Sequence, residues 1–303
     1  MMKRDILSIL DLPDLEEVLD RAVEMKSGQT TGREMGGKSL AMIFEKSSTR
    51  TRVSFEVAMT QMGGHSIFLS QDDTQLGRGE TIPDTARVLS RFVNAIMYRA
   101  YKHTDMVELA KHSRVPVINA LDDMEHPCQI AADMMTIREH KGRLKGLRLA
   151  YVGDGNNVSH SLLLGGAMVG MDVVVGCPDG YCPDAGIVAK AAEMAKGNGS
   201  FVDVVTDPFD AVKGADIVYT DTWVSMGDEE QVSQRKKALL PYQVNKELMS
   251  AAKPDAIFMH CLPAHRGNEV SDEVMDGKQS VVFDQAENRL HAQKAILLTV
   301  LNG

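Results

Sequence analysis

The chain has 303 residues, of which 44% are hydrophobic and 25% are charged, a balance typical of a globular protein with a substantial core. The length predicts two domains of ordinary size or one large α/β domain. A formal net charge of -9 argues against nucleic acid as the main partner, so any anionic substrate needs a local cluster of cations and backbone N–H groups.

Signals for secretion or membrane insertion are not apparent in the sequence. No apolar run reaches the roughly 18 to 20 residues that a membrane span needs, and the N-terminus leads into an acidic helix rather than an apolar leader. The cysteines are too sparse for a disulfide scaffold and show no paired CxxC spacing for zinc. We therefore expect a cytoplasmic protein with no membrane partner, no metal and no cofactor. The cysteines are Cys128, Cys177, Cys182 and Cys261.

Short apolar segments alternate with helical patterns along the first half of the chain. The expected strands are Ser39–Phe44, Ser66–Leu69, Ala95–Tyr98 and Val115–Ile118. The helical patterns are Leu15–Met25, Arg52–Met62, Asp84–Arg91, Met106–His112 and Pro127–His140.

The same rhythm restarts after a short basic break with two glycines at Lys141–Gly146, which is the expected domain boundary. A last helix of about 17 residues, Gln285–Leu301, is long enough to fold back across the first domain. The strands expected in this half are Leu147–Val152, Asp172–Gly176, Phe201–Val205, Asp216–Thr220, Ala256–Met259 and Ser280–Phe283.

Alternating strands and helices of this kind predict parallel sheets covered by helices on both faces. The two series therefore predict an α/β fold of two doubly wound domains, 1–140 and 141–284, joined by interdomain helices. Residues 285–303 are expected to pack back on the first domain. Because ligands bind such sheets at the carboxyl ends of the strands, the segments that follow the strands are the candidate sites.

The segment Glu45–Arg52 joins the first expected strand to a helix and concentrates hydroxyl groups and two arginines. The N–H groups and the dipole at a helix N-terminus favour an anion, and the guanidinium fork matches phosphate oxygens. The plainer alternative is that Ser and Thr cap the helix while the arginines are solvated. Because the Walker A spacing is absent, this candidate anion site is not a nucleotide P-loop.

A second strand-to-helix junction, Tyr151–Asn157, contains a G-x-G motif that is similar to part of a dinucleotide fingerprint. The third glycine of that fingerprint would fall at Val158, and Asp172 lies near the start of the next expected strand rather than at its carboxyl end. We interpret the glycines as a tight turn. A nicotinamide-dependent oxidoreductase is the alternative from a different functional class.

Several blocks, together with Ser48–Arg52, resemble the motifs of the aspartate/ornithine carbamoyltransferase family. They occur in the family's order and span nearly the whole chain, so chance agreement is negligible. The blocks are Gln75–Glu80, Asp84–Ser90, Arg99, His126–Gln129, Gly153–Asn157, Asp221–Gly227, His260–Pro263 and Ala286–Arg289.

The resemblance implies that the first domain binds carbamoyl phosphate. Gln75 would reach the phosphate from a neighbouring subunit, although taken alone it is a loop residue. A homotrimer, or a multiple of trimers, with shared active sites is thus expected. The phosphate contacts within one chain would be Ser48, Thr49, Arg50, Thr51 and Arg289.

The resemblance also assigns residues to the carbamoyl group, whose oxygen gains negative charge as the amine attacks. Arg99 and His126, assisted by Thr51, would donate hydrogen bonds to that oxygen. The acceptors for the carbamoyl NH2 would be the Gln129 side chain and the backbone carbonyls of Cys261 and Leu262.

Asp221–Gly227 resembles the acceptor loop D-x-x-x-S-M-G of the family's ornithine-specific members, which implies that the second domain binds L-ornithine. Asp221 would bind an ammonium group. The amino-acid moiety would contact Asn157, Ser225 and Met226. Aspartate-specific members need cations for a dicarboxylate acceptor. Taken alone, the segment is a polar surface loop.

Cys261 has three interpretations. It is a candidate covalent nucleophile, and an inert buried cysteine is the commoner case. The resemblance implies instead that its sulfur, with Asp221, positions the side-chain amine of ornithine and helps it lose a proton, while attack is direct. The implied activity is carbamoyl transfer to ornithine, giving citrulline and phosphate in arginine metabolism. Transfer to another amine such as putrescine, and a catalytically silent regulatory relative, are the alternatives.

Overall fold

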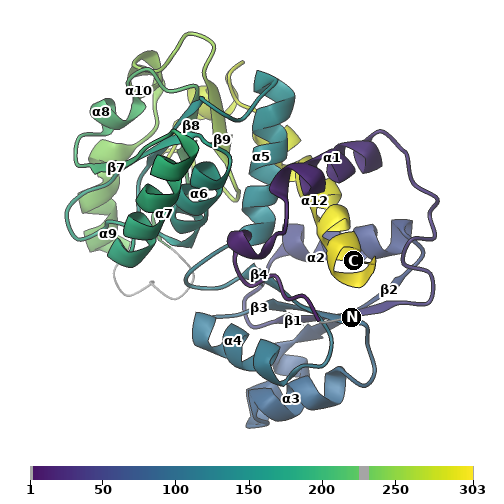
Figure 1. The fold of residues 1–303 in the computed structure, drawn as a ribbon. Coiled ribbons are helices and arrows are strands. Elements are labelled where there is room, and N and C mark those ends of the chain that lie inside the picture. The colour runs from purple at the N-terminus through teal and green to yellow at the C-terminus, as the bar shows by residue number, and fades with distance from the viewer. Residues whose placement is uncertain (1–2, 225–231, 303) are drawn as a thin grey trace. The chain divides into compact units, whose positions relative to one another are not determined.

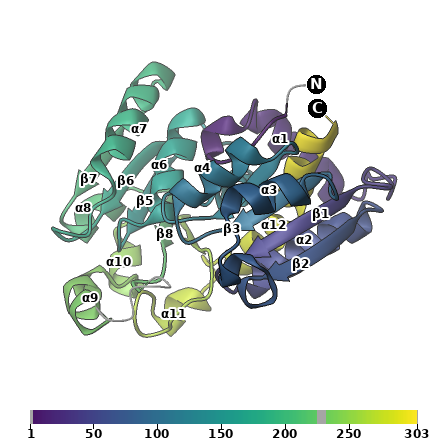
Figure 2. The same ribbon diagram turned by 90° about the horizontal axis from the view of Figure 1, so that it is seen from below.

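The computed structural model describes residues 3–224 and 232–302. The chain divides into two compact units: one comprises the residues up to Met135 and those from Glu287 onward, and the other runs from Thr136 to Ala286. Each unit holds one parallel sheet with helices on both of its faces, which confirms the expected α/β class (Figure 1 and Figure 2). Within the described ranges, no helix is long and apolar enough to cross a membrane.

The first unit contains a four-stranded parallel sheet in the order β2-β1-β3-β4. Its strands are β1 (Ser39–Phe44), β2 (His65–Ser70), β3 (Ala95–Arg99) and β4 (Val117–Leu121). Its helices are α1 (Leu15–Lys26), α2 (Thr49–Gln61), α3 (Ile82–Leu89) and α4 (His103–His112), with 3-10 turns η1 (Ile9–Asp11), η2 (Gln71–Asp73) and η3 (Leu76–Arg78). Two helices, α5 (Pro127–Lys141) and α12 (Val282–Asn302), each have residues in both units.

Side chains alternate across the first sheet, so its two faces carry different residues. Ile43 of β1 and Tyr98 of β3 pack in one cluster with Ala86 of α3 and Met106 of α4. Figure 1 shows α3 and α4 on this face and α2 on the opposite face. The sheet is thus buried on both sides, which explains its nearly continuous apolar strands.

The second unit contains a five-stranded parallel sheet in the order β7-β6-β5-β8-β9. Its strands are β5 (Arg148–Val152), β6 (Asp172–Gly176), β7 (Val202–Val205), β8 (Ile217–Thr220) and β9 (Ile257–His260). Its helices are α6 (Asn157–Met168), α7 (Ala185–Asn198), α8 (Pro208–Val212), α9 (Val232–Leu239), α10 (Lys246–Ser250) and α11 (Asp272–Met275), with the 3-10 turn η5 (Leu240–Tyr242).

The faces of this second sheet are covered in the same way. Val152 of β5 and Val218 of β8 pack with Val212 of α8 in one buried cluster. On the other face α6 lies so close to the sheet that a Cβ at Gly166 would come 2.3 Å from Val173 Cγ2 in β6. Only a glycine permits that approach of helix to strand.

Each sheet has a point where successive crossovers turn to opposite sides. The point lies between β1 and β3 in the first sheet and between β5 and β8 in the second. Loops that leave neighbouring strands at such a point diverge to opposite faces and open a crevice, where ligands of α/β proteins bind. Of the residues singled out in the sequence, Ser48–Thr51, Asn157 and Asp221 lie in the segments that follow β1, β5 and β8, and Arg99 ends β3.

The strand expected at Ser280–Phe283 is wrong. Only Ser280 pairs, in a single parallel bridge with Phe258, and Val282 already begins α12. Val281 and Val282 are buried, and a short buried apolar run does not by itself distinguish a strand from a helix start.

Several other expected boundaries shift by two or three residues, and two of these shifts have a local explanation. The strand expected from Val115 begins at Val117, after Pro116, which has no N–H for a ladder. The helix expected from Arg52 begins at Thr49, so part of the hydroxyl-rich segment is the first helical turn.

Candidate functional site

The loop after β1 and the first turn of α2 form a hydroxyl-rich corner in the first unit. Ser48 is the N-cap of α2: its Oγ accepts from the Thr51 N–H at 3.3 Å and donates to Thr51 Oγ1 at 3.0 Å. Thr51 is buried, Arg50 is half-buried and Thr49 is exposed. The capping and anion-site interpretations are compatible, because the cap engages one N–H group and a helix N-terminus has several.

Glu45 ties the start of this corner to the neighbouring strand β3. Its carboxylate accepts from the Tyr98 hydroxyl and from the Tyr101 N–H, both at 2.7 Å. The Glu45 N–H donates to the Arg99 carbonyl at 3.0 Å. Burial, with the hydrogen bond to Glu45, raises the pKa of Tyr98, so the phenol remains a donor. The loops after β1 and β3 are therefore held side by side.

Arg289 of α12 reaches into the same corner. It donates to Thr51 Oγ1 at 3.2 Å and to Gln129 Oε1 on α5. With its amide turned so that the oxygen faces Arg289, Gln293 accepts from the guanidinium at 3.0 and 3.2 Å. Gln129 in turn donates to Asp133 at 2.8 Å. Arg289 thus contacts both Thr51 and Gln129, and all three were assigned to one ligand from the sequence.

His126 lies beside three arginines. It directly precedes α5, while Arg99 ends β3, and both side chains are buried. Burial, followed by the charges of Arg289, Arg99 and Arg50, lowers the pKa of His126 well below 6.5. The imidazole is therefore neutral at physiological pH and can donate one N–H to an oxygen while the arginines supply positive charge.

The loop that carries His126 is shaped by the buried carboxylate of Asp122. This carboxylate accepts from the N–H groups of Met124 and Glu125, each at 2.8 Å, and pairs with His103 Nδ1 at 2.7 Å. The hydrogen bond to Asp122 raises the pKa of His103. The sequence did not identify Asp122, because a lone aspartate after a strand has no distinctive pattern.

Gln75 differs from the other phosphate candidates in its placement. It is exposed and is the N-cap of η3, with no side-chain cap hydrogen bond. In the described part of the chain, no hydrogen bond joins its side chain to the Ser48–Thr51 corner. A role for Gln75 within its own chain is therefore not supported by a contact.

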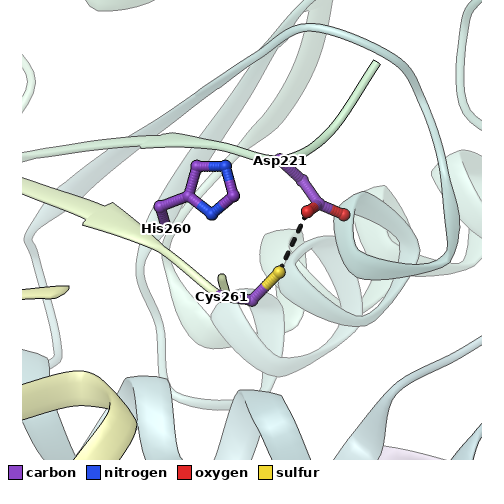
Figure 3. Close-up of side chains that lie close together, drawn as sticks. All are labelled: Asp221, His260 and Cys261. Carbon is purple, nitrogen blue, oxygen red and sulfur yellow. Dashed lines mark hydrogen bonds between the residues drawn. The ribbon is translucent and has the colours of Figure 1, made fainter. Parts of the chain in front are cut away.

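In the second unit, Asp221 and Cys261 face each other across neighbouring strands (Figure 3). Asp221 directly follows β8 and Cys261 directly follows β9. The Cys261 Sγ donates to Asp221 Oδ1 at 3.0 Å, and the Asn156 amide donates to Asp221 Oδ2 at 2.8 Å. The buried carboxylate is thus held at both oxygens, with a thiol beside it.

His260 supports the backbone next to Cys261. Its N–H donates to Gln285 at 2.9 Å, and its Nδ1 accepts from the Leu262 N–H at 2.8 Å. Leu262 has a φ of +60°, a conformation that L residues rarely adopt. Ligand atoms of Asp221, His260 and Cys261 lie within 4.8 Å of one another. Because Nδ1 is engaged and Nε2 lies 3.4 Å from Glu269, the imidazole is oriented toward protein groups.

The turn after β5 brings Asn156, not Asn157, onto the carboxylate. Asn156 is the N-cap of α6: its Oδ1 accepts from the N–H groups of Val158 and Ser159 at 3.0 and 3.2 Å. Asn157 is half-buried in the first turn of α6. Asn156 was not predicted as a site residue from the sequence, although an Asn before an apolar helix is a recognised cap signal. Ser225 and Met226 lie outside the described residues.

The geometry of this turn disfavours the dinucleotide alternative. A Cβ at Gly155 would come 2.2 Å from Pro183 N, so the following loop already covers the glycine that a pyrophosphate would approach. Asp172 is the first residue of β6, and its carboxylate accepts from the Phe201 N–H at 3.1 Å. The acid is therefore at the wrong end of the strand for a ribose.

Comparison with known proteins gives matches to both halves of the chain. Residues 4–139 match the carbamoyl-P binding domain of aspartate/ornithine carbamoyltransferase, and residues 145–300 match its Asp/Orn binding domain. The chain is 58% identical over 294 residues to an ornithine carbamoyltransferase of Methanobrevibacter smithii, covering 97% of this chain and 98% of that protein. It is 53% identical over 304 residues to a catabolic ornithine carbamoyltransferase of Thermoplasma volcanium, covering 100% of each.

A solved structure is similar over almost the same extent. The ornithine carbamoyltransferase from Pyrococcus furiosus superimposes with a TM-score of 0.94 at 55% identity, covering 99% of this chain and 98% of that one.

Proposed function

The chain belongs to the aspartate/ornithine carbamoyltransferase family, and we propose that it transfers the carbamoyl group of carbamoyl phosphate to the side-chain amine of L-ornithine. The products are L-citrulline and phosphate. The observation that carries the proposal is the opposite charge of the two clusters. The positive charges of three arginines act at His126, as a phosphate and a developing oxyanion require, whereas the Asp221 carboxylate beside the Cys261 thiol suits an ammonium group.

The first unit binds carbamoyl phosphate in this proposal. The phosphate lies on the start of α2, where Ser48, Thr49 and Thr51 supply hydroxyl or N–H donors and Arg50 and Arg289 supply charge. These groups stabilise the negative charge of the leaving phosphate. Phosphate oxygens would take the place of the neutral oxygens of Thr51 and Gln129 to which Arg289 now donates.

The carbonyl oxygen of the same substrate is polarised by Arg99 and His126. Because burial and the nearby arginines lower the pKa of His126, its neutral imidazole donates one ring N–H to the oxygen while Arg99 supplies the positive charge. The amide oxygen of Gln129 and the carbonyls of Cys261 and Leu262 accept from the carbamoyl NH2, which orients the carbon for attack.

The second unit binds ornithine. The Asp221 carboxylate accepts hydrogen bonds from N–H groups of ornithine. Asn157, Ser225 and Met226 contact its amino-acid moiety. The Cys261 sulfur lies beside Asp221 and orients the side-chain amine, which must be uncharged to attack. The uncharged amine nitrogen bonds to the carbonyl carbon, the bond from that carbon to the phosphate oxygen breaks, and the departing phosphate takes up the proton that the nitrogen loses. We assign the Cys261 thiol to orientation of the amine, as the family resemblance implies, and its hydrogen bond to Asp221 keeps it beside the carboxylate that binds that amine.

We also propose a division into two substrate-binding domains, a trimeric assembly and a cytoplasmic location. Residues 1–140 with the terminal helix 285–303 form the carbamoyl-phosphate domain, and residues 141–284 form the ornithine domain. The protein assembles as a homotrimer or a multiple of trimers in the cytoplasm, and Gln75 completes the phosphate site of a neighbouring subunit. Its exposure supports this role. Mixing inactive Arg99→Ala and Gln75→Ala chains should restore part of the activity, and absence of recovery would count against shared sites.

A steady-state assay of three acceptors tests the proposal. With saturating carbamoyl phosphate, kcat/KM should be highest for ornithine and far lower for putrescine and aspartate. Putrescine lacks the α-carboxylate, and aspartate presents a second carboxylate to Asp221. A larger kcat/KM for putrescine would sink the assignment of the acceptor. Inactivity with all three would favour a silent relative, and NADH binding measured by fluorescence would revive the oxidoreductase alternative.

A further inference from the structure

Cys177 and Cys182 lie in the loop after β6, outside the residues assigned to either substrate. Both are free thiols, of which Cys177 is buried and Cys182 is exposed. Their Sγ atoms are 3.2 Å apart, and the Cys177 thiol donates to the Cys182 sulfur. Because a disulfide bond is about 2.05 Å long, a movement of about 1 Å would close it.

The loop between the two cysteines is held in place at several points. The Tyr181 N–H donates to the Pro178 carbonyl at 3.0 Å, and the Tyr181 carbonyl accepts from the Gly155 N–H at 2.8 Å. Beyond the second cysteine, the Asp184 N–H donates to His160 Nε2 on α6 at 2.9 Å. The thiols are therefore kept together by the fold rather than by their own contact alone.

Tight packing against the turn after β5 restricts the loop further. A Cβ at Gly155 would come 2.4 Å from the Cys182 carbonyl carbon and 2.2 Å from Pro183 N. The backbone of Cys182 thus lies directly on the turn that presents Asn156 and Asn157. A bond between the cysteines would close this loop on itself at the place where it packs against that turn.

We propose that Cys177 and Cys182 form a reversible dithiol–disulfide site that is oxidised by small disulfides such as glutathione disulfide. The exposed Cys182 thiol loses its proton and attacks one glutathione sulfur, and the first glutathione leaves and takes up a proton. The Cys177 thiol then loses its proton and attacks Cys182 Sγ, and the second glutathione leaves protonated. Two protein thiols lose two electrons, which reduce one glutathione disulfide to two glutathiones.

The different exposure of the two thiols sets this order of steps. Burial raises the pKa of Cys177, which makes it a poor first nucleophile. Cys182 is accessible to a reagent, and a resolving thiol at 3.2 Å captures the mixed disulfide. The inference does not depend on which amine accepts the carbamoyl group, because neither cysteine is among the residues assigned to a substrate.

Peptide mapping tests the inference on the purified full-length chain. The protein is incubated with glutathione disulfide and then denatured in the presence of N-ethylmaleimide, which labels free thiols. It is digested with trypsin and analysed by mass spectrometry. Both cysteines fall in one tryptic peptide, since no Lys or Arg lies between Arg148 and Lys190. We expect this peptide to carry no maleimide and to be two hydrogens lighter than the same peptide with both thiols reduced. The peptide that contains Cys128, which is buried in the folded chain, should carry the label and serves as the internal control. Maleimide on both cysteines, or a persistent glutathione adduct on Cys182, would overturn the proposal.

Thermal unfolding gives a second, independent measurement. The oxidised chain should unfold a few degrees above the reduced chain, because the bond restricts the unfolded state. Cys177→Ser and Cys182→Ser should each abolish the difference between oxidising and reducing conditions. An equal rise in either variant, or no rise in the wild type, would contradict a disulfide at this site.

Discussion

Cys261 and Asp221 are joined by a hydrogen bond of 3.0 Å from thiol to carboxylate, although 40 residues separate them in the sequence. Each follows a strand, and β8 and β9 are neighbours in the sheet. The parallel topology therefore creates the pair, because it aligns the carboxyl ends of both strands on one edge.

Replacing Cys261 by serine should separate the two substrates kinetically. We expect kcat/KM for ornithine to fall about 10- to 100-fold, because the shorter serine hydroxyl can still donate to Asp221 but no longer places a sulfur beside the amine. The KM for carbamoyl phosphate should change less than about twofold, because the backbone carbonyl of residue 261 remains. Cys182→Ser is the matched control, with unchanged steady-state constants under reducing conditions. An equal loss in both KM values would contradict an amine-orienting role.

Arg50 and Arg52, which belong to the same motif, should behave differently. Arg50 contributes positive charge at His126, whereas Arg52 pairs with Glu56 at 3.0 Å and covers the Phe68 ring on the surface. Arg50→Ala should raise the Kd for carbamoyl phosphate by about 100-fold, as expected for a lost charge-assisted fork. Arg52→Ala should change it less than about threefold. Equilibrium binding by calorimetry measures both, and equal affinity of Arg50→Ala and wild type would refute the phosphate assignment.

Asn156 should matter for both stability and acceptor use. Asn156→Ala removes the cap of α6 and the donor to Asp221. We expect a loss of about 1 kcal/mol in the free energy of unfolding from the cap and a higher KM for ornithine. Asn157→Ala should raise the KM for ornithine without the loss of stability. Urea denaturation and steady-state kinetics distinguish the two, and similar stability losses would contradict the assignment of the cap.

His126 should make unfolding depend on pH in a defined direction. Its pKa in the folded chain is well below 6.5. Below about pH 6.5 the unfolded chain takes up a proton that the folded chain does not, so this contribution to stability is present above pH 6.5 and lost as pH falls. The stability of the wild type relative to His126→Gln should therefore fall between pH 6.5 and 5, by at most about 1.4 kcal/mol per pH unit. Urea titrations at several pH values measure it, and a constant difference would contradict a neutral buried imidazole.

Two glycines of the second unit should respond in opposite ways to alanine. Gly155→Ala places a Cβ 2.2 Å from backbone, so a backbone shift costing about 1 to 3 kcal/mol is expected. Gly197→Ala, in α7 with open space around the new Cβ, should stabilise by up to about 1 kcal/mol. Thermal unfolding compares them, and a neutral Gly155→Ala would contradict the tight packing of the loop on this turn.

The fold class followed from the alternation of short apolar segments with helical periodicity, because that pattern is local. The error at Ser280–Phe283 has a local origin as well, since Val281 and Val282 are buried at a helix start and carry the same β-branched signal as a strand. The strand order was not predicted, because it depends on pairing between distant segments.

Some residues of the candidate site were predicted from the sequence, and others became apparent only in the structure. Motif resemblance identified Thr51, Gln129 and Arg289, and the structure joins them by hydrogen bonds across up to 238 residues. It did not identify Asn156 or Asp122, whose roles arise from contacts with Asp221 and with the loop before His126. Such supporting residues are defined by their neighbours in space, so a sequence motif contains no direct sign of them.

Product stoichiometry tests the central claim most directly. The purified protein is incubated with carbamoyl phosphate, with and without ornithine, and citrulline, phosphate and the intact protein mass are measured. Direct transfer predicts one citrulline for each phosphate, turnover that requires ornithine, and no carbamoyl adduct on the protein. Phosphate release without citrulline, or a carbamoylated Cys261 that is consumed when ornithine is added, would contradict it.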